Sequence, residues 1–118
     1  FVQGFITYSN CAKQQQLGVA ESLLIKHGAV SEAVVIAMAM GARKKANANV
    51  AIAVSGVAGP AGGSIDKPVG TVWLAWAIQD TGTVARCYQF KGGRDAVRAQ
   101  AVTRAIDELN KALSKKAV

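Results

Sequence analysis

Lys13 lies where a lysine side chain can be kept in its neutral form. It follows Asn10, a good helix N-cap, by three residues and so falls in the first turn of a predicted helix. The positive end of the helix dipole disfavours an ammonium there, and burial would act in the same direction. A neutral lysine can serve as a general base toward a serine hydroxyl, and Tyr8, at the end of an expected strand, can hydrogen-bond nearby. The alternative is that Lys13 is simply exposed.

A glycine-rich segment, Gly56–Gly63, directly follows a buried apolar run. Glycines allow the backbone to approach a ligand closely, and exposed N–H groups can cradle a phosphate. The segment is not a Walker loop, because no Gly-Lys-Ser/Thr follows, and it is not a dinucleotide fingerprint, because no clear helix begins after it. On this pattern a structural turn and a ligand loop are equally good interpretations. Lys67 adds a cation nearby, and a solvated lysine is the alternative there.

Arg94 begins the last predicted helix, directly after Gly92 and Gly93, and Arg98 lies one turn further on the same side. The forked guanidinium group suits phosphate recognition, although surface charge is the simpler interpretation. His27, the single histidine, falls at a helix end, where it complements the dipole. With one histidine and no carboxylate cluster, the sequence favours neither metal nor Ser-His-Asp chemistry, and it predicts no metal site and no cofactor.

Alternating elements must position these residues. Helices are expected over 10–17, over 21–26 closed by Gly28, from the cap Ser31 through Arg43-Lys44-Lys45, and from about Arg94 onward; strands are expected over 1–8, 50–54, 70–78 and 83–90. The last two strands meet at Asp80-Thr81-Gly82, which predicts an antiparallel hairpin. Helices that alternate with strands early, followed by a hairpin, predict a three-layer α/β/α sandwich on a mixed, mostly parallel sheet.

Two helices carry informative apolar patterns. The helix that follows Ser31 is apolar on nearly every side, which is typical of a helix buried on more than one face, and this predicts a homo-oligomer, a dimer or higher. The last helix has an apolar stripe opposite a charged face. The stripe consists of Val102, Ile106, Leu109 and Leu113.

Composition narrows the class of protein. The 118 residues are 51% hydrophobic and 18% charged, which indicates an ordinary globular chain, and one domain over 1–118 is expected. The net charge of +7 permits an anionic small molecule or nucleic acid, but the cations are scattered and lack interleaved aromatics, which disfavours nucleic acid. Two distant cysteines favour free thiols. No apolar run is long enough for a membrane span and no signal peptide is visible, so a cytoplasmic location is expected.

The chain resembles the C-terminal domain of the CinA (competence- and damage-inducible) family. Four segments carry the resemblance, in order along nearly the whole chain: Thr7–Asn10 with Lys13 and Leu17–Val19, Gly28–Glu32 with Met38–Ala39, Gly56–Gly63 with Lys67–Val72, and Arg94 with Val97–Arg98. The third segment is the most specific of the four.

The resemblance implies an amidohydrolase that converts the carboxamide of nicotinamide mononucleotide to nicotinic acid mononucleotide and ammonia, in pyridine-nucleotide recycling. It implies a Ser/Lys mechanism in which Lys13 and Tyr8 are catalytic. The substrate-binding residues that it implies are Ser9, Asn10, Gly56, Gly59, Gly62, Gly63 and Arg94. The implied partner is a small-molecule nucleotide, without a membrane or nucleic acid.

The resemblance also locates a difference from the family. The family's nucleophilic serine lies just upstream of the aromatic residue that Phe1 matches, and its first strand and helix lie earlier still. We therefore expect the N-terminal strand and helix to be missing from this chain. Two alternatives stay open beside the amidase: a non-catalytic nucleotide-binding CinA-like protein, and a competence-associated accessory protein.

Overall fold

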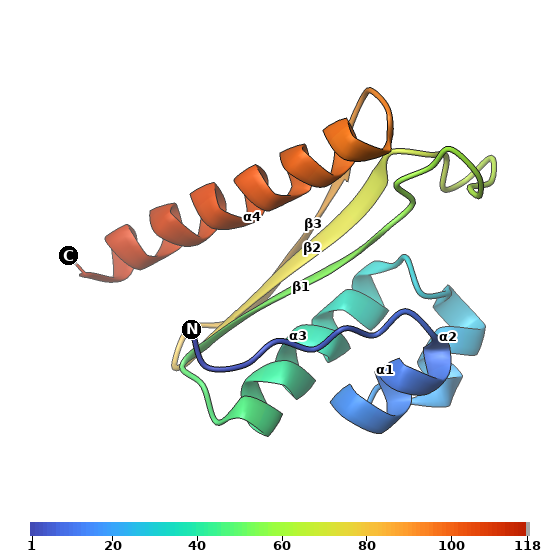
Figure 1. The fold of residues 1–118 in the computed structure, drawn as a ribbon. Helices are drawn as coiled ribbons and strands as arrows, with labels where there is room; N and C mark the ends of the chain where they lie inside the picture. The colour runs from blue at the N-terminus through green and yellow to red at the C-terminus, as the bar shows by residue number, and fades with distance from the viewer. Residues whose placement is uncertain (118) are drawn as a thin grey trace.

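The computed structural model describes residues 1–117, in which helices lie on both faces of a small sheet (Figure 1). The elements are α1 (Asn10–Leu17), α2 (Glu21–His27), α3 (Glu32–Ala46), β1 (Val50–Gly56), β2 (Thr71–Ile78), β3 (Gly82–Gln89) and α4 (Arg94–Ala117). Helices α1 to α3 cover one face of the sheet and α4 crosses the other (Figure 1). These bounds agree closely with the helices and the last three strands that the sequence predicts.

The sheet corrects the predicted fold class. Within residues 1–117, three strands form one sheet in the order β1-β2-β3, and both pairings are antiparallel. Ala75, for example, pairs with Ala53 on one side and Ala85 on the other. The prediction of a mixed, mostly parallel sheet is wrong. A parallel pairing of β1 with β2 needs a crossover, usually a helix, whereas the loop between them contains no helix and returns the chain directly.

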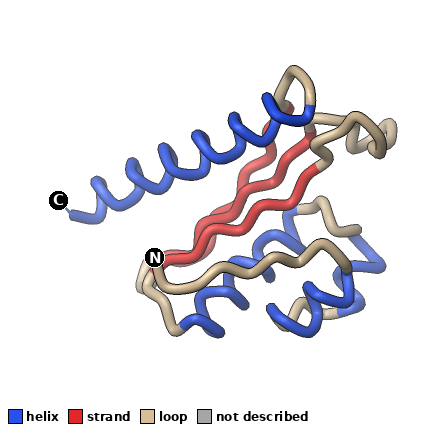
Figure 2. The backbone as a smooth tube through the Cα atoms, viewed as in Figure 1, coloured by secondary structure: helices blue, strands red, loops and turns tan. Residues whose placement is uncertain are grey.

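The N-terminal segment 1–8 is the second correction. We expected a strand, but the segment runs as a loop past α3 and β1 (Figure 2). Its apolar and β-branched residues suit a strand, yet a strand exists only when its N–H and C=O groups pair with a neighbour. A groove lies between this segment and the edge of β1, so the ladder does not form.

A core of small side chains fixes α3 on the sheet. Val34, Val35 and Ala39 are fully buried and pack with Ala75 and Ala77 of β2. At Gly41 the backbone of α3 passes so close to the Leu17 carbonyl that no Cβ fits. This close approach holds α1, and with it Lys13, against the rest of the fold.

The buried face of α4 differs from the predicted stripe. Val97, Ala101 and Ala105 face Leu74 and Trp76, at the four-residue spacing that keeps side chains on one helix face. Val102 and Ile106, which we expected to be buried, are 59% and 51% exposed. Small alanines let the helix lie close to the sheet, and this places the longer apolar residues to one side.

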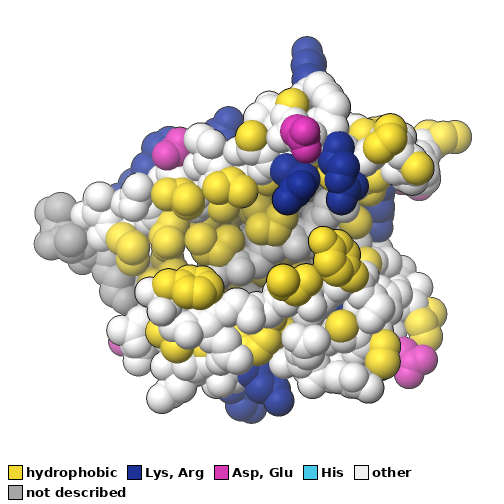
Figure 3. Space-filling view, viewed as in Figure 1, with side chains coloured by type: hydrophobic (Ala, Val, Ile, Leu, Met, Phe, Trp, Pro, Cys, Tyr) yellow, Lys and Arg dark blue, Asp and Glu magenta, His cyan; other side chains and the backbone are white. Residues whose placement is uncertain are grey.

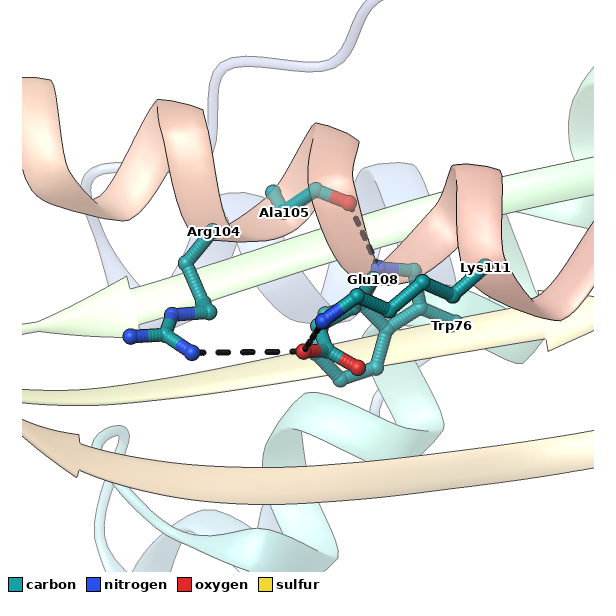
Figure 4. Close-up of polar contacts among 5 residues, drawn as sticks. All are labelled: Trp76, Arg104, Ala105, Glu108 and Lys111. Atoms are coloured by element: carbon teal, nitrogen blue, oxygen red, sulfur yellow. Dashed lines mark hydrogen bonds and ion pairs between the residues drawn. The ribbon is translucent and has the colours of Figure 1, made fainter.

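A tryptophan joins α4 to the sheet. Trp76 Nε1 donates a hydrogen bond of 2.9 Å to the carbonyl of Ala105 (Figure 4). Beside it, the Glu108 carboxylate lies 3.9 Å from Arg104 and 3.6 Å from Lys111 (Figure 4). These ion pairs are exposed on the cationic side and contribute little, so the buried indole bond is the specific contact.

Local signals in the sequence account for the helix ends. Ser31 caps α3 through a hydrogen bond from Val34 N, as predicted. The cap of α1 is Ser9 rather than Asn10, because Ser9 Oγ accepts from Ala12 N at 2.9 Å. The hairpin at Asp80–Gly82 is confirmed, and Cys11 and Cys87 are free thiols, as expected.

Candidate functional site

A groove of about 1140 Å³ lies between the N-terminal segment 1–8, helix α3 and strand β1. Lys13, Tyr8 and Gly56 line it, together with Ser55. Its volume slightly exceeds the range of roughly 300–1,000 Å³ that is usual for small-molecule sites. Figure 3 shows apolar side chains gathered across this face of the molecule, below α4.

Lys13 is the buried cation of this groove. Its side chain is 5% exposed, and Nζ donates a 2.6 Å hydrogen bond to the carbonyl of Thr7. Burial lowers the pKa of the Lys13 ammonium from its ordinary value of 10.5, because desolvation penalises the charged form. The alternative of a simply exposed lysine is therefore wrong. The Thr7 carbonyl fixes the direction of the amine, and an amine of lowered pKa is suited to accept a proton.

The other polar residues before Lys13 lie in different surroundings. Tyr8 lines the groove but is 90% exposed, and the bond of Lys13 goes to the backbone of Thr7 rather than to the tyrosine ring. Ser9 is occupied as the helix cap, and Asn10 is exposed in the first turn. Among residues 1–117, the structure brings Lys13 and Tyr8 to the groove, while Ser9 and Asn10 are not in its lining.

Gly56 connects the groove to the glycine-rich loop. It ends β1, and a Cβ there would lie 2.8 Å from the Thr71 carbonyl and from a Val72 methyl group. The loop that follows closes at its base through Val57 N to Thr71 O, at 2.9 Å, and Gly70 N to Val57 O, at 2.7 Å. The loop therefore leaves the end of the sheet and returns to it, and these two hydrogen bonds hold its ends together.

Arg94 contacts this loop. Its Nη1 donates to the carbonyl of Gly59 at 3.0 Å, so the first residue of α4 holds the loop from one side. Gly59, Gly62 and Gly63 all have positive φ, between 85° and 91°, which favours glycine at each position. None of these residues belongs to the lining of the groove in the described chain. The predicted site therefore forms two neighbouring parts joined at Gly56.

Two contacts were not found by sequence reasoning. The Thr7 carbonyl that orients Lys13 is a backbone group, and no side-chain pattern indicates it. Ser55 Oγ lines the groove and donates to the carbonyl of Ala29 at 2.8 Å, 26 residues away. Ser55 follows the apolar run Val50–Val54, and this position of a polar residue was the one sequence feature that could have indicated the contact.

The buried amine of Lys13 suits acid–base chemistry. Among residues 1–117, no group of three or more His, Cys, Asp or Glu side chains could hold a metal ion. The groove combines an amine of lowered pKa with the end of β1, where the glycine-rich segment begins. An amine of this kind can deprotonate a hydroxyl.

Comparison with known proteins decides the family. The family model of the CinA C-terminal domain matches residues 1–113. The chain belongs to the CinA C-terminal domain family. The resemblance read from the sequence motifs is thereby confirmed.

Several relatives of this chain carry the same name. Nicotinamide-nucleotide amidohydrolase PncC of Escherichia coli K12 is 54% identical over 109 residues, which cover 92% of this chain and 66% of the relative. The protein of the same name from Pseudomonas putida is 53% identical and is covered to 68%. The chain thus spans about two thirds of the length of the curated relatives that it matches.

Solved structures of the family have the same fold. The competence/damage-inducible protein CihA of Agrobacterium tumefaciens superposes with a TM-score of 0.89 at 40% identity, over 92% of this chain and 66% of that one. A CinA superfamily protein from Klebsiella pneumoniae gives 0.87 at 42% identity, over 92% and 68%. In the part of this chain that is described, no helix has the length and apolar character to cross a membrane.

Proposed function

We propose that this chain forms the greater part of a nicotinamide-nucleotide amidohydrolase, which hydrolyses the carboxamide of nicotinamide mononucleotide to nicotinic acid mononucleotide and ammonia. Relatives that are more than half identical over nine tenths of the chain bear that name. The observation that carries the proposal is Lys13, a buried lysine of lowered pKa that faces a groove large enough for a nucleotide.

The reaction is an acyl transfer through a serine. Neutral Lys13 takes the hydroxyl proton while the serine oxygen attacks the carboxamide carbon and its C=O electrons move to oxygen. As the C–N bond breaks, the ammonium group of Lys13 gives that proton to the amide nitrogen, which leaves as ammonia. Water then attacks the ester carbon, gives its proton to Lys13, and the serine leaves with that proton. In the proposed mechanism, backbone N–H groups of the glycine-rich segment other than those that close its base stabilise both tetrahedral oxyanions.

The attacking serine is a separate part of the proposal. Ser9 caps α1 and Ser55 donates to Ala29, so both hydroxyls already have structural roles. The family resemblance assigns the nucleophile to a serine upstream of the position that Phe1 matches. Tyr8, on the groove, is the candidate to hold the substrate or its departing amine.

The proposed phosphate site is the loop that Arg94 holds. An arginine presents five N–H donors in a fork, so Arg94 can keep its bond to Gly59 and still bind an anion. The exposed N–H groups of the glycine-rich segment complete the cradle. The recognised unit is then the 5′-phosphate of the mononucleotide.

The test measures ammonia and nicotinic acid mononucleotide with the protein at its full natural length. We expect turnover of nicotinamide mononucleotide, and a much weaker reaction with nicotinamide riboside, which lacks the phosphate. Free nicotinamide should not react. Equal rates with all three amides would contradict a nucleotide amidohydrolase, and binding without any ammonia release would favour the non-catalytic alternative.

A further inference from the structure

Lys67, in the loop between β1 and β2, contacts an element far away in the sequence. Its Nζ donates a 2.7 Å hydrogen bond to the carbonyl of His27, the last residue of α2. The residue is partly buried rather than freely solvated. Figure 1 shows the loop and the α2–α3 turn at the same end of the molecule. The contact therefore spans two segments that are 40 residues apart.

The carbonyl that Lys67 binds needs such a donor. Carbonyl groups in the last turn of a helix have no partner within the helix, and a lysine is well suited to bind them because that end of the dipole is negative. Three consecutive carbonyls of this turn each accept a side-chain donor: His27 from Lys67, Gly28 from Ser31, and Ala29 from Ser55. The turn between α2 and α3 is thus bound to the loop by Lys67, to the start of α3 by Ser31 and to β1 by Ser55.

The neighbouring backbone leaves room for the ammonium group. Gly28 has φ +78°, and a Cβ there would lie 3.2 Å from Lys67 Nζ. On the loop side, Lys67 N donates to Ser64 Oγ at 3.1 Å and Ser64 N donates to Lys67 O at 3.0 Å. The turn Ser64–Lys67 therefore holds the lysine in place, and the missing side chain of Gly28 leaves space for its ammonium group.

The Lys67 bond lies opposite another tether of the same loop. Arg94 holds Gly59 from α4, and Gln89 Nε2 donates to the Val69 carbonyl at 2.9 Å from β3. Lys67 is the tether to the helical layer that carries Lys13. Without it, the loop would keep its contacts to β3 and α4 but lose its direct side-chain link to α2.

We infer that Lys67 is a positioning residue, which joins the glycine-rich loop to the end of α2 and so fixes the loop for nucleotide binding. The part of this inference that concerns the nucleotide rests on the proposed function; the tether itself does not. Lys67 acts through the loop and need not touch the substrate. Its loss should affect binding (KM) more than the chemical step (kcat).

The experiment replaces Lys67 by cysteine and then rebuilds the amine chemically. Cys11 and Cys87 are exposed, so the work uses a Cys11→Ser, Cys87→Ala background. Alkylation of Lys67→Cys with 2-bromoethylamine gives a thioether analogue of lysine with the same ammonium group. Lys26→Cys, an exposed position in α2, is the matched control for the lost charge and for the reagent.

Amide hydrogen exchange is the first readout. We expect Lys67→Cys to raise exchange in residues 57–70 by roughly tenfold, the size expected from the loss of one hydrogen bond to a charged group. Exchange in β2 and α4 should not change, and aminoethylation should restore the loop. Unchanged loop exchange in Lys67→Cys, or the same change in Lys26→Cys, would overturn the tether.

Kinetics with nicotinamide mononucleotide at full natural length is the second readout. KM should rise by roughly tenfold with kcat within about twofold, and the aminoethylated protein should regain the original KM. A loss confined to kcat would overturn the positioning role. If the loop responds as expected but the unmodified protein neither binds nor hydrolyses the nucleotide, the proposed function fails and the tether stands.

Discussion

At the scale of single residues, Lys13 is the group that sets the groove apart from an ordinary apolar surface. A 5% exposed amine whose bond goes to a backbone carbonyl has a cost in stability at neutral pH, because burial disfavours its charged form. Structural lysines usually leave their ammonium groups in water. The cost at Lys13 is understandable if the lowered pKa is used in chemistry, as is common at functional sites.

Lys13 predicts a dependence of stability on pH. Its pKa is lower in the folded chain than in the unfolded chain, where it is near 10.5. Between these two values the unfolded chain binds more protons, so the free energy of unfolding contributed by Lys13 rises as pH rises toward 10.5. Urea unfolding measured from pH 7 upward should show this rise in the unmodified protein and not in Lys13→Met.

Cys87 also contributes to the dependence of stability on pH. Burial raises the pKa of the Cys87 thiol above its ordinary 9.0, so its contribution to stability falls as pH rises. The difference between the two proteins, both carrying Cys87→Ala, isolates Lys13. At pH 7 we expect Lys13→Met to be within about 1 kcal/mol of the parent, since the lost hydrogen bond is offset by removal of a buried charge. A parallel pair of pH profiles would contradict the assignment.

At the scale of elements, α4 offers a matched pair of substitutions. Val97 is 1% exposed against the sheet, while Val102, five residues further along, is 59% exposed. We expect Val97→Ala to lower the free energy of unfolding by about 2 kcal/mol and Val102→Ala by less than about 0.5 kcal/mol. Chemical denaturation measures both. Equal losses would mean that the predicted stripe, not the observed face, packs on the sheet.

The contact between α1 and α3 predicts a second effect at this scale. Alanine is normally favoured over glycine inside a helix by about 1 kcal/mol, but a methyl group at Gly41 meets the Leu17 carbonyl. Gly41→Ala should therefore destabilise the protein by about 1–3 kcal/mol and displace Lys13. Gly93→Ala, where a Cβ meets no atom within 4 Å, is the control; because Gly93 precedes α4 at the cap position, where alanine is disfavoured, a loss of less than about 1 kcal/mol is expected. Thermal unfolding of both variants checks the prediction.

Elements were predictable from the sequence to the extent that local chemistry fixes them. Helix and hairpin ends are set by residue types that can be recognised in the sequence. They are the cap Ser31, the glycine at position 18, which adopts a positive φ, and the Asp80–Gly82 turn. The direction of β1 against β2 depends on whether a connection crosses over, and residues 57–70 gave no clear sign of that. The buried face of α4 contains Ala101 and Ala105. A prediction based on large apolar residues passes over such small side chains and selects another face.

The candidate site was predictable in part for a similar reason. Lys13 and Tyr8 were proposed from spacing and resemblance, and the structure brings both to one groove. The partners that orient the site are backbone carbonyls of Thr7, His27 and Gly59, which accept from Lys13, Lys67 and Arg94. Every residue has a carbonyl, so no sequence pattern distinguishes these three before the chain is folded.

At the scale of the whole molecule, the net charge of +7 raises the question of nucleic acid. Part of this charge is engaged in contacts within the chain, because Lys13, Lys67 and Arg94 all donate to backbone carbonyls. We expect weak binding to duplex DNA at low salt that is lost between roughly 50 and 200 mM salt, as for non-specific binding. Fluorescence anisotropy with labelled DNA measures it. Tight binding that persists at 200 mM salt would favour the accessory-protein alternative.

The proposed role of Lys13 is that of general base in an amide hydrolysis. It is tested by the pH profile of kcat/KM for nicotinamide mononucleotide, taken for the protein at full natural length and for Lys13→Met. We predict that kcat/KM of the unmodified protein rises with pH through an apparent pKa below 10.5, and that Lys13→Met loses activity by roughly 10²–10⁴-fold together with that pH dependence. A variant that keeps its activity, or keeps the same pH dependence, would contradict the account.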